Sequence, residues 1–184
     1  MKEYLKYYWL ETEYLEEVRL NFLQRGYLTA KELCTIVAWK NPKFGIRKLS
    51  RELLTDVGAE KLTRSISGAS TREERLHVLL YTEDTKTKRK GIKLATASAI
   101  LTILYPEEYT VYDIRVRKQL RSFGIWSENP DDITDKGNVV ELYFSRYLDV
   151  LLNLAKENDM TLRDLDRALW AKDWNEDLES FLEK

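Results

Sequence analysis

The residues of this sequence that could carry out chemistry gather in two stretches, 88–93 and 112–115. The first surrounds Gly91 with four bases, namely Lys88, Arg89, Lys90 and Lys93. A glycine turn that leads into a helix N-terminus can bind a phosphate through backbone N–H groups, and nearby lysines add salt-sensitive affinity. The second stretch contains Asp113, and a carboxylate can stabilise the cationic sugar of a breaking glycosidic bond or deprotonate the attacking water. Together they predict phosphate binding beside a reactive carboxylate.

The order and spacing of these residues resemble the core of the helix-hairpin-helix DNA glycosylase superfamily. The similar segments read GIKLATASAIL (91–101) and VYDIRV (111–116). Gly91 matches the first hairpin glycine and Ala97 the small residue of the following helix, while Asp113 falls sixteen residues after Ala97, where the catalytic aspartate is expected. Residues 38–43 and 161–170 are also similar to uncharacterised relatives of this superfamily. The resemblance implies that the protein binds double-stranded DNA. It also implies that the protein is a monofunctional base-excision glycosylase.

This sequence departs from the family pattern at two positions of the hairpin. Lys93 stands where a second glycine is usual, and Ala95 stands where strand-cleaving members carry a lysine nucleophile. Schiff-base chemistry at that position is therefore excluded. A single cysteine, Cys34, rules out a four-cysteine iron–sulfur cluster, and a single histidine, His77, rules out His-based zinc sites. We predict no cofactor and no metal; the resemblance would allow a monovalent cation on the hairpin, which Lys93 disfavours.

By resemblance, the fold is all-α with two helical lobes. One lobe spans 28–123 and contains the hairpin; the other combines 1–27 with 124–184. A cleft between the lobes would hold Asp113 at its edge, with lysines reaching DNA phosphates. The implied DNA-binding residues are Lys88, Arg89, Lys90, Gly91, Lys93 and Arg115, and the implied pocket residues are Trp39, Lys40 and Tyr112.

Each of these side chains also has a purely structural interpretation. Asp113 precedes a predicted helix, where aspartate is a favoured N-cap, and capping is compatible with catalysis. Trp39 is equally typical of a core aromatic residue, and Lys40 of a charge that stabilises a helix C-terminus. Tyr112 flanks Asp113 and either stacks on a base or packs in the core.

The elements that would position these residues are helices, predicted from apolar residues at helical spacing and from capping residues. Thr29 with Glu32 and Thr71 with Glu74 form capping-box patterns, and Asp113, Thr161 and Asp173 are expected to begin later helices. The predicted helices span 4–25, 29–41, 45–54, 59–67, 71–80, 94–105, 114–123, 139–157 and 161–170, with a short closing helix from 173. No strand pairs are evident.

The charge is unevenly distributed along the 184 residues, although the net charge is only −1. Residues 86–121 contain nine bases and three acids, a net charge of +6, whereas 128–184 contain fifteen acids and seven bases. One segment suits a polyanion, while the acidic segment suits a protein partner. With no apolar run long enough for a membrane helix and no signal-peptide pattern, we expect no membrane partner and a cytoplasmic location.

Three functions remain compatible with the sequence. The first is a glycosylase that uses water as nucleophile and Asp113 as the stabilising carboxylate. The second is a non-catalytic DNA-binding module on the same scaffold. The third is a helical interaction protein whose acidic C-terminal face contacts another protein. The missing second glycine favours the last two, and the aspartate favours the first.

Overall fold

The computed structural model describes residues 1–8, 13–83, 87–126 and 139–183. Within these ranges the protein is all-α, as predicted, and the only β pairing is an isolated antiparallel bridge between Tyr81 and Lys88. Contacts divide the chain into two compact units. Unit 1 comprises 1–10 and 109–184, and unit 2 comprises 11–108. No helix in the described ranges is long and apolar enough to cross a membrane.

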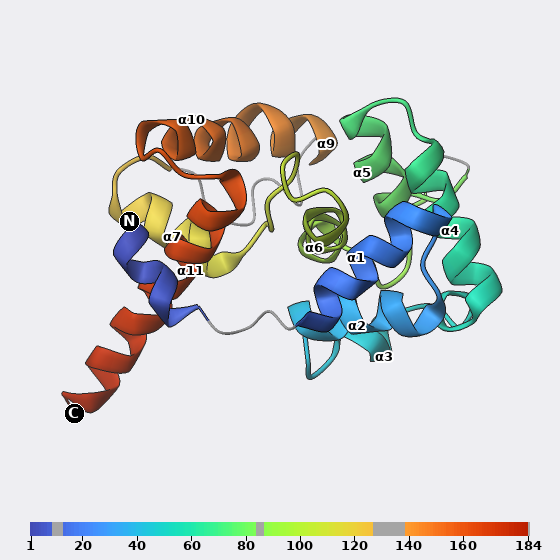
Figure 1. The fold of residues 1–184 in the computed structure, drawn as a ribbon, viewed down its shortest axis with the longest axis horizontal. Helices are drawn as coiled ribbons and strands as arrows, with labels where there is room; N and C mark the ends of the chain where they lie inside the picture. The colour runs from blue at the N-terminus through green and yellow to red at the C-terminus, as the bar shows by residue number, and fades with distance from the viewer. Residues whose placement is uncertain (9–12, 84–86, 127–138, 184) are drawn as a thin grey trace. The chain divides into compact units, whose positions relative to one another are not determined.

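Unit 2 is built around α6 (Leu94–Leu104), which packs against α1, α2 and α5. In Figure 1, α6 is viewed end-on with these helices beside it. Its residues 97–104 are all buried, which fits its run of small and aliphatic side chains. The other elements of unit 2 are α1 (Glu13–Arg25), α2 (Ala30–Lys40), α3 (Gly45–Lys48), the 3-10 helix η2 (Glu52–Leu54), α4 (Asp56–Gly68) and α5 (Arg72–Leu80).

Local capping sets the starts of two helices of unit 2, as the sequence predicts. Thr29 and Glu32 form a complete capping box on α2, and Thr71 and Glu74 form one on α5. Gly26 ends α1 with a positive φ of 77°, and its N–H donates to the carbonyl of Phe22 at 2.7 Å. These signals act over a few residues, so they can be recognised in the sequence alone.

Unit 1 begins with the 3-10 helix η1 (Lys2–Tyr7), which packs against the long C-terminal helix α11 (Leu162–Leu182). Helix α7 (Ile114–Ser122) packs against α11 as well. The predicted helix over 139–157 is continuous but not uniform. It consists of α9 (Val139–Leu142), a π-helical segment η3 (Tyr143–Leu148) and α10 (Asp149–Glu157).

Three predicted boundaries are wrong. The expected helix over 4–25 is split, because η1 ends at Tyr7 and Tyr8 is extended before α1 begins at Glu13. Asp173 does not begin a closing helix; it lies within α11, with its side chain 2% exposed and paired with bases of α7. In place of one helix over 45–54, the structure has the short helix α3, which ends at Lys48, and the 3-10 helix η2, which begins at Glu52.

The division into units also differs from the boundaries expected at Leu28 and Phe123. Helix α1 belongs with α6, where the ring of Phe22 meets that of Tyr105 edge-on at 5.8 Å. Helix α7 belongs with α11 through its ion pairs. The physical reason is that each helix packs in the unit whose side chains contact its apolar or charged face.

Candidate functional site

Unit 2 carries a cluster of bases that we call the basic junction, defined as residues 43–51 together with 88–93. These two stretches contain no acidic residue and eight bases: Lys43, Arg47, Lys48, Arg51, Lys88, Arg89, Lys90 and Lys93. The first stretch includes α3, and the second leads into α6. The predicted DNA-binding residues Lys88, Lys90, Gly91 and Lys93 therefore lie in the structure beside bases that the sequence analysis did not single out.

The two stretches are held together at Gly91. This residue has a φ of +86°, and a Cβ built on it would overlap the carbonyl oxygen of Lys48 and lie 2.7 Å from the Cα of Leu49. Glycine is therefore required both by the backbone conformation and by the close approach of the chain. The turn at Gly91 brings the two basic segments side by side through residues that are 43 positions apart in the sequence, Lys48 and Gly91.

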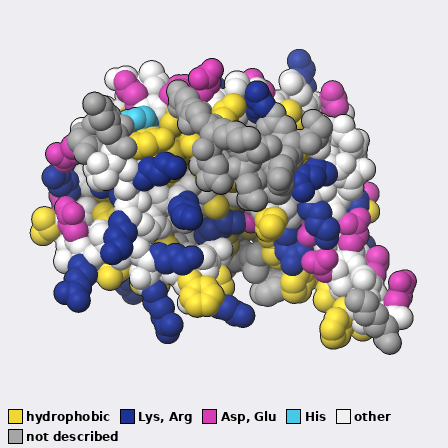
Figure 2. All heavy atoms as spheres, turned by 180° about the vertical axis from the view of Figure 1, so that it is seen from behind, with side chains coloured by type: hydrophobic (Ala, Val, Ile, Leu, Met, Phe, Trp, Pro, Cys, Tyr) yellow, Lys and Arg dark blue, Asp and Glu magenta, His cyan; other side chains and the backbone are white. Residues whose placement is uncertain are grey.

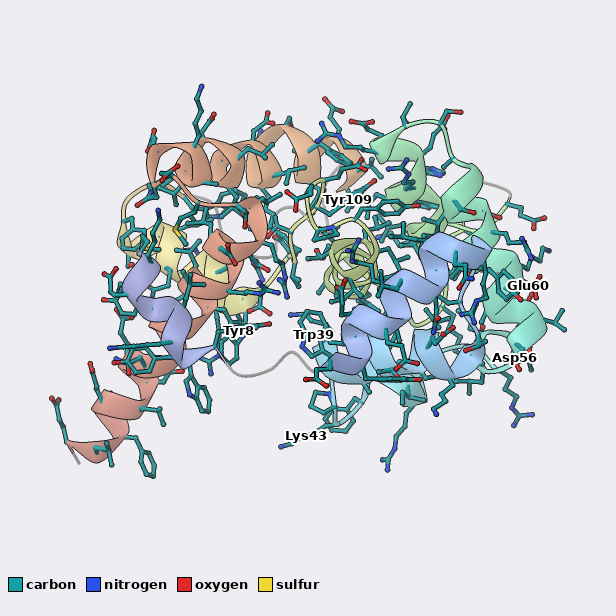
Figure 3. All side chains as sticks on the ribbon, viewed as in Figure 1. Tyr8, Trp39, Lys43, Asp56, Glu60 and Tyr109 are labelled. Carbon is teal, nitrogen blue, oxygen red and sulfur yellow. The ribbon has the colours of Figure 1, made fainter. Side chains whose placement is uncertain are left out.

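Seven of the eight bases are exposed, and Arg89 is half-buried. Among the described residues, none of these seven forms an ion pair within the structure. Figure 3 shows Lys43 in the turn that follows α2, and Figure 2 shows lysine and arginine side chains gathered over this unit. A group of exposed bases with no acid among them produces a positive potential that attracts a polyanion.

Arg89 has a different environment from its neighbours. Its guanidinium donates to the backbone carbonyls of Val78 and Tyr81 at 3.1 and 2.8 Å. Burial lowers the pKa of Arg89, an effect that the charges of Glu52 and Glu83 oppose. Arg89 is therefore committed to the protein backbone in this structure.

The start of α6 partly follows the predicted hairpin pattern. Lys93 is its N-cap residue but makes no side-chain capping hydrogen bond, and its carbonyl accepts from the N–H groups of Thr96 and Ala97 at 2.9 Å. Ala97 is fully buried, which explains the need for a small residue there. In place of a helix directly before the turn, α5 ends at Leu80 and a loop with the Tyr81–Lys88 bridge intervenes.

Trp39 and Lys40, predicted as pocket residues, occupy the last turn of α2 in unit 2, and both are half-buried. Lys40 lies in the last turn of α2, which is the position expected for a charge that stabilises a helix C-terminus. The remaining predicted residues, Tyr112, Asp113 and Arg115, belong to unit 1.

Asp113 is the N-cap of α7. Its Oδ1 atom accepts a hydrogen bond from the N–H of Arg115 at 2.8 Å, and the residue is 8% exposed. The capping role predicted from the sequence is therefore confirmed. The same contact fixes one carboxylate oxygen, so the side chain has a defined orientation at the start of a helix that carries four bases.

Two tyrosines of η3 hold the extended link that leads to Asp113. The hydroxyl of Tyr143 donates to the carbonyl of Thr110 at 2.6 Å and accepts from its N–H at 3.1 Å. The hydroxyl of Tyr147 donates to the carbonyl of Val111 at 2.6 Å and accepts from the N–H of Asp113 at 3.5 Å. Burial, with the charges of Asp166 and Asp113, raises the pKa of Tyr147 well above its usual value. The two tyrosine hydroxyls thus satisfy buried backbone groups of the extended link.

Tyr112 and Arg115 both have partners inside unit 1. Arg117 stacks over the Tyr112 ring at 4.3 Å and donates to its hydroxyl at 3.1 Å. Arg115 binds Asp173 and Asp177, each at 2.6 Å. Tyr112 is buried, and the Arg115 side chain is 25% exposed, so both take part in packing within this unit.

Within the described ranges, no group of three or more His, Cys, Asp or Glu side chains is arranged to hold a metal ion. No sequence motif pointed to Lys43, Arg47, Lys48 and Arg51 as binding residues, because only the folded chain brings their stretch to Gly91. The absence of any acidic residue from 43–51 is the sequence feature that could have indicated a phosphate-binding surface there. The sequence analysis also missed Tyr143 and Tyr147, whose spacing of four fits ordinary helix packing.

Comparisons with known proteins add no relative to this description. The chain matches no protein-family model, no curated protein and no solved structure.

Proposed function

We propose that this protein binds double-stranded DNA through the basic junction of unit 2. The observation that carries the proposal is the meeting of residues 43–51 and 88–93 at Gly91, which together hold seven exposed bases and no acid. Exposed bases of this kind bind phosphates and release counterions, so the affinity is expected to be independent of base sequence and strongly weakened by salt. Arg115 is not included in this interface, because two aspartates of α11 engage it.

The test is binding to a labelled duplex at several salt concentrations, with and without an abasic-site analogue. The double variant Lys48→Ala/Lys90→Ala removes one base from each stretch. It should lower the slope of log affinity against log salt by about 2, given roughly 0.9 per phosphate contact. The double variant Lys6→Ala/Lys156→Ala removes two exposed lysines of unit 1 and should leave the slope unchanged. Absence of binding at low salt would refute the proposal.

A second candidate function is base excision, in which Asp113 stabilises the cationic sugar and water is the nucleophile. The specific observation in its favour is the fixed, buried carboxylate at the start of the basic helix α7. A carboxylate held in place by a backbone N–H needs little rearrangement to stabilise a developing positive charge. Because Ala95 replaces the usual lysine, this activity would be monofunctional, and borohydride should trap no enzyme–DNA adduct through a lysine at that position.

The test of this candidate is base release from a panel of duplexes carrying damaged or mismatched bases. Asp113→Asn is the informative variant, because asparagine also caps helices and should preserve α7. It should retain DNA affinity and lose base release. Base release by the variant at the wild-type rate would remove Asp113 from the mechanism. DNA binding with no release from any duplex would leave a non-catalytic DNA-binding module.

A further inference from the structure

The loop between α5 and α6 presents two bases of the basic junction, Lys88 and Lys90, to solvent. A short backbone pairing closes this loop. The N–H of Thr82 donates to the carbonyl of Thr87 at 2.9 Å, and the N–H of Arg89 donates to the carbonyl of Leu80 at 2.7 Å. Isolated pairings of this size are marginal in water, so the loop requires further support.

Arg89 supplies that support from the C-terminal end of α5. The last carbonyls of a helix have no partner within the helix. At the end of α5, the carbonyl of His77 accepts a hydrogen bond from the N–H of Tyr81. The carbonyl of Val78 accepts one from the guanidinium of Arg89, and the carbonyl of Leu80 accepts one from the backbone N–H of Arg89. The guanidinium also reaches the carbonyl of Tyr81. One residue thereby caps the helix and closes the loop, and its charge lies at the negative end of the helix dipole.

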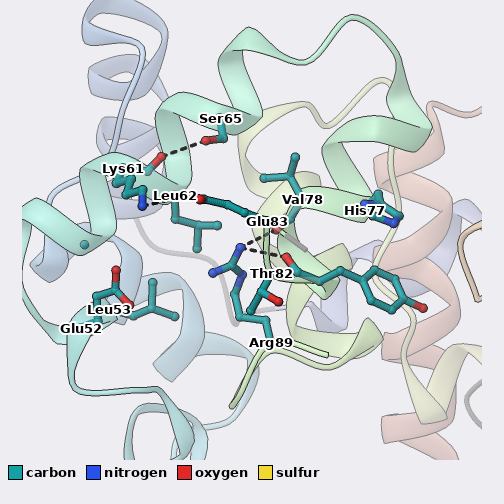
Figure 4. A pocket seen from close by; sticks show the side chains of 12 residues that line it. Glu52, Leu53, Lys61, Leu62, Ser65, His77, Val78, Thr82, Glu83 and Arg89 are labelled. Atoms are coloured by element: carbon teal, nitrogen blue, oxygen red, sulfur yellow. Dashed lines mark hydrogen bonds and ion pairs between the residues drawn. The ribbon is translucent and has the colours of Figure 1, made fainter. Parts of the chain in front are cut away.

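On its α4 side the loop borders a cleft. Behind the loop lies an open cleft of about 570 Å³ that is lined by α4, α5 and Arg89 itself. Across the cleft, Lys61 of α4 pairs with Glu83 of the loop at 2.8 Å (Figure 4), but both side chains are largely exposed. An exposed pair contributes little to stability. The hydrogen bonds of Arg89 therefore tie the described part of the loop to α5, and they act beside the hydroxyl of Thr82, which donates to the carbonyl of Thr87 at 3.1 Å.

We infer that Arg89 is a positioning residue of the basic junction, which holds Lys88 and Lys90 in place without contacting DNA. This inference rests on the proposed DNA binding only where affinity is concerned. It predicts that a positive charge alone at position 89 does not keep the loop ordered, because the hydrogen-bonding geometry of the arginine is also needed. Both hydrogen bonds come from one guanidinium nitrogen, Nη2, whose two N–H groups the planar group holds in fixed directions. Lysine keeps the charge, but its ammonium is a strongly hydrated point charge on a flexible stem, so it should hold the two carbonyls less well.

The experiment compares Arg89→Lys and Arg89→Ala with Lys88→Ala, using two measurements on the full chain. The first is amide hydrogen exchange over residues 81–90 without DNA. Both Arg89 variants should exchange faster than wild type at Thr82, while Lys88→Ala should exchange at the wild-type rate. The second is duplex affinity against salt. Both Arg89 variants should bind at least about fivefold more weakly with an unchanged salt slope, whereas Lys88→Ala should lower the slope by about 0.9.

The two arms separate the two ideas. If Arg89→Lys matches wild type in exchange and in affinity, Arg89 acts as a charge and the inference is wrong. A lowered salt slope in Arg89→Ala that Arg89→Lys restores would likewise assign Arg89 to a phosphate contact. If wild type binds no duplex, the proposed function fails, and the exchange measurement alone still decides whether Arg89 holds the loop.

Discussion

The Nη1 atom of Arg115 lies 2.6 Å from a carboxylate oxygen of Asp173, a residue 58 positions later in the chain. Asp173 is nearly buried, and Lys118 approaches its other oxygen at 3.0 Å. The Arg115 guanidinium also lies over the rings of Trp170 and Trp174, at 5.5 and 5.2 Å. This contact joins α7, which begins at Asp113, to the C-terminal helix.

Replacement of Asp173 by asparagine should therefore destabilise unit 1. The change leaves Arg115 and Lys118 without their buried counter-charge, and we expect a loss of about 1–3 kcal/mol in unfolding free energy. Asp177→Asn is the matched control, because Asp177 contacts the same two bases but is 46% exposed. Its effect should stay below about 1 kcal/mol. Urea denaturation of both variants measures the difference, and equal losses would contradict the prediction.

Tyr147→Phe should lower stability by about 1–2 kcal/mol, because the buried carbonyl of Val111 loses its hydroxyl donor. Tyr143→Phe should behave similarly through Thr110. Tyr7→Phe, at a residue that is 38% exposed, should be close to neutral. Thermal unfolding followed by circular dichroism checks all three. A neutral Tyr147→Phe would show that the link to Asp113 does not depend on this hydroxyl.

Three glycine-to-alanine variants should separate backbone strain from steric overlap. Gly91→Ala combines a positive φ with overlap against Lys48 and should cost about 3 kcal/mol or more. Gly26→Ala has the positive φ but only an ordinary contact with Ser67, and should cost about 1 kcal/mol. Gly68→Ala meets nothing within 4 Å and should be neutral or stabilising by up to about 1 kcal/mol. A different order of the three melting temperatures would refute the account of Gly91.

Glu32 should give the protein an acid-sensitive contribution to stability. Burial acts to raise the pKa of Glu32, but hydrogen bonds from Thr29 and Asn21, with the charge of Arg25, lower it below the usual 4.5. A carboxyl with a lowered folded-state pKa stabilises the fold above pH 4.5 and loses this contribution as the pH falls through the lowered value.

Glu32→Gln should therefore be less stable than wild type at pH 7 and should lose less stability between pH 5 and pH 3. Glu13→Gln, at an exposed position in the first turn of α1, is the control and should follow the wild-type pH profile. The measurement is unfolding free energy against pH. Parallel profiles for wild type and Glu32→Gln would contradict the prediction.

Much of the local structure was predictable from the sequence, because its signals act within about four residues. The capping boxes of Thr29 and Thr71 and the cap at Asp113 depend on side chains that bond to the backbone of the next turn. Such hydrogen bonds join residues close in the sequence, so their pattern can be recognised before any tertiary contact is known. The all-α class follows from apolar residues at helical spacing with few helix-breaking residues.

The sequence by itself thus determined most of the helices, the caps at Thr29, Thr71 and Asp113, and the acid-free basic stretch around Gly91. Only the tertiary structure decided which bases face solvent together. It placed residues 43–51 against Gly91, turned Arg89 back onto α5 and paired Arg115 with Asp173. The physical reason is that the direction of a long charged side chain depends on which carbonyls and carboxylates the fold brings near, and these can lie far away in the sequence, as Asp173 does at 58 positions from Arg115.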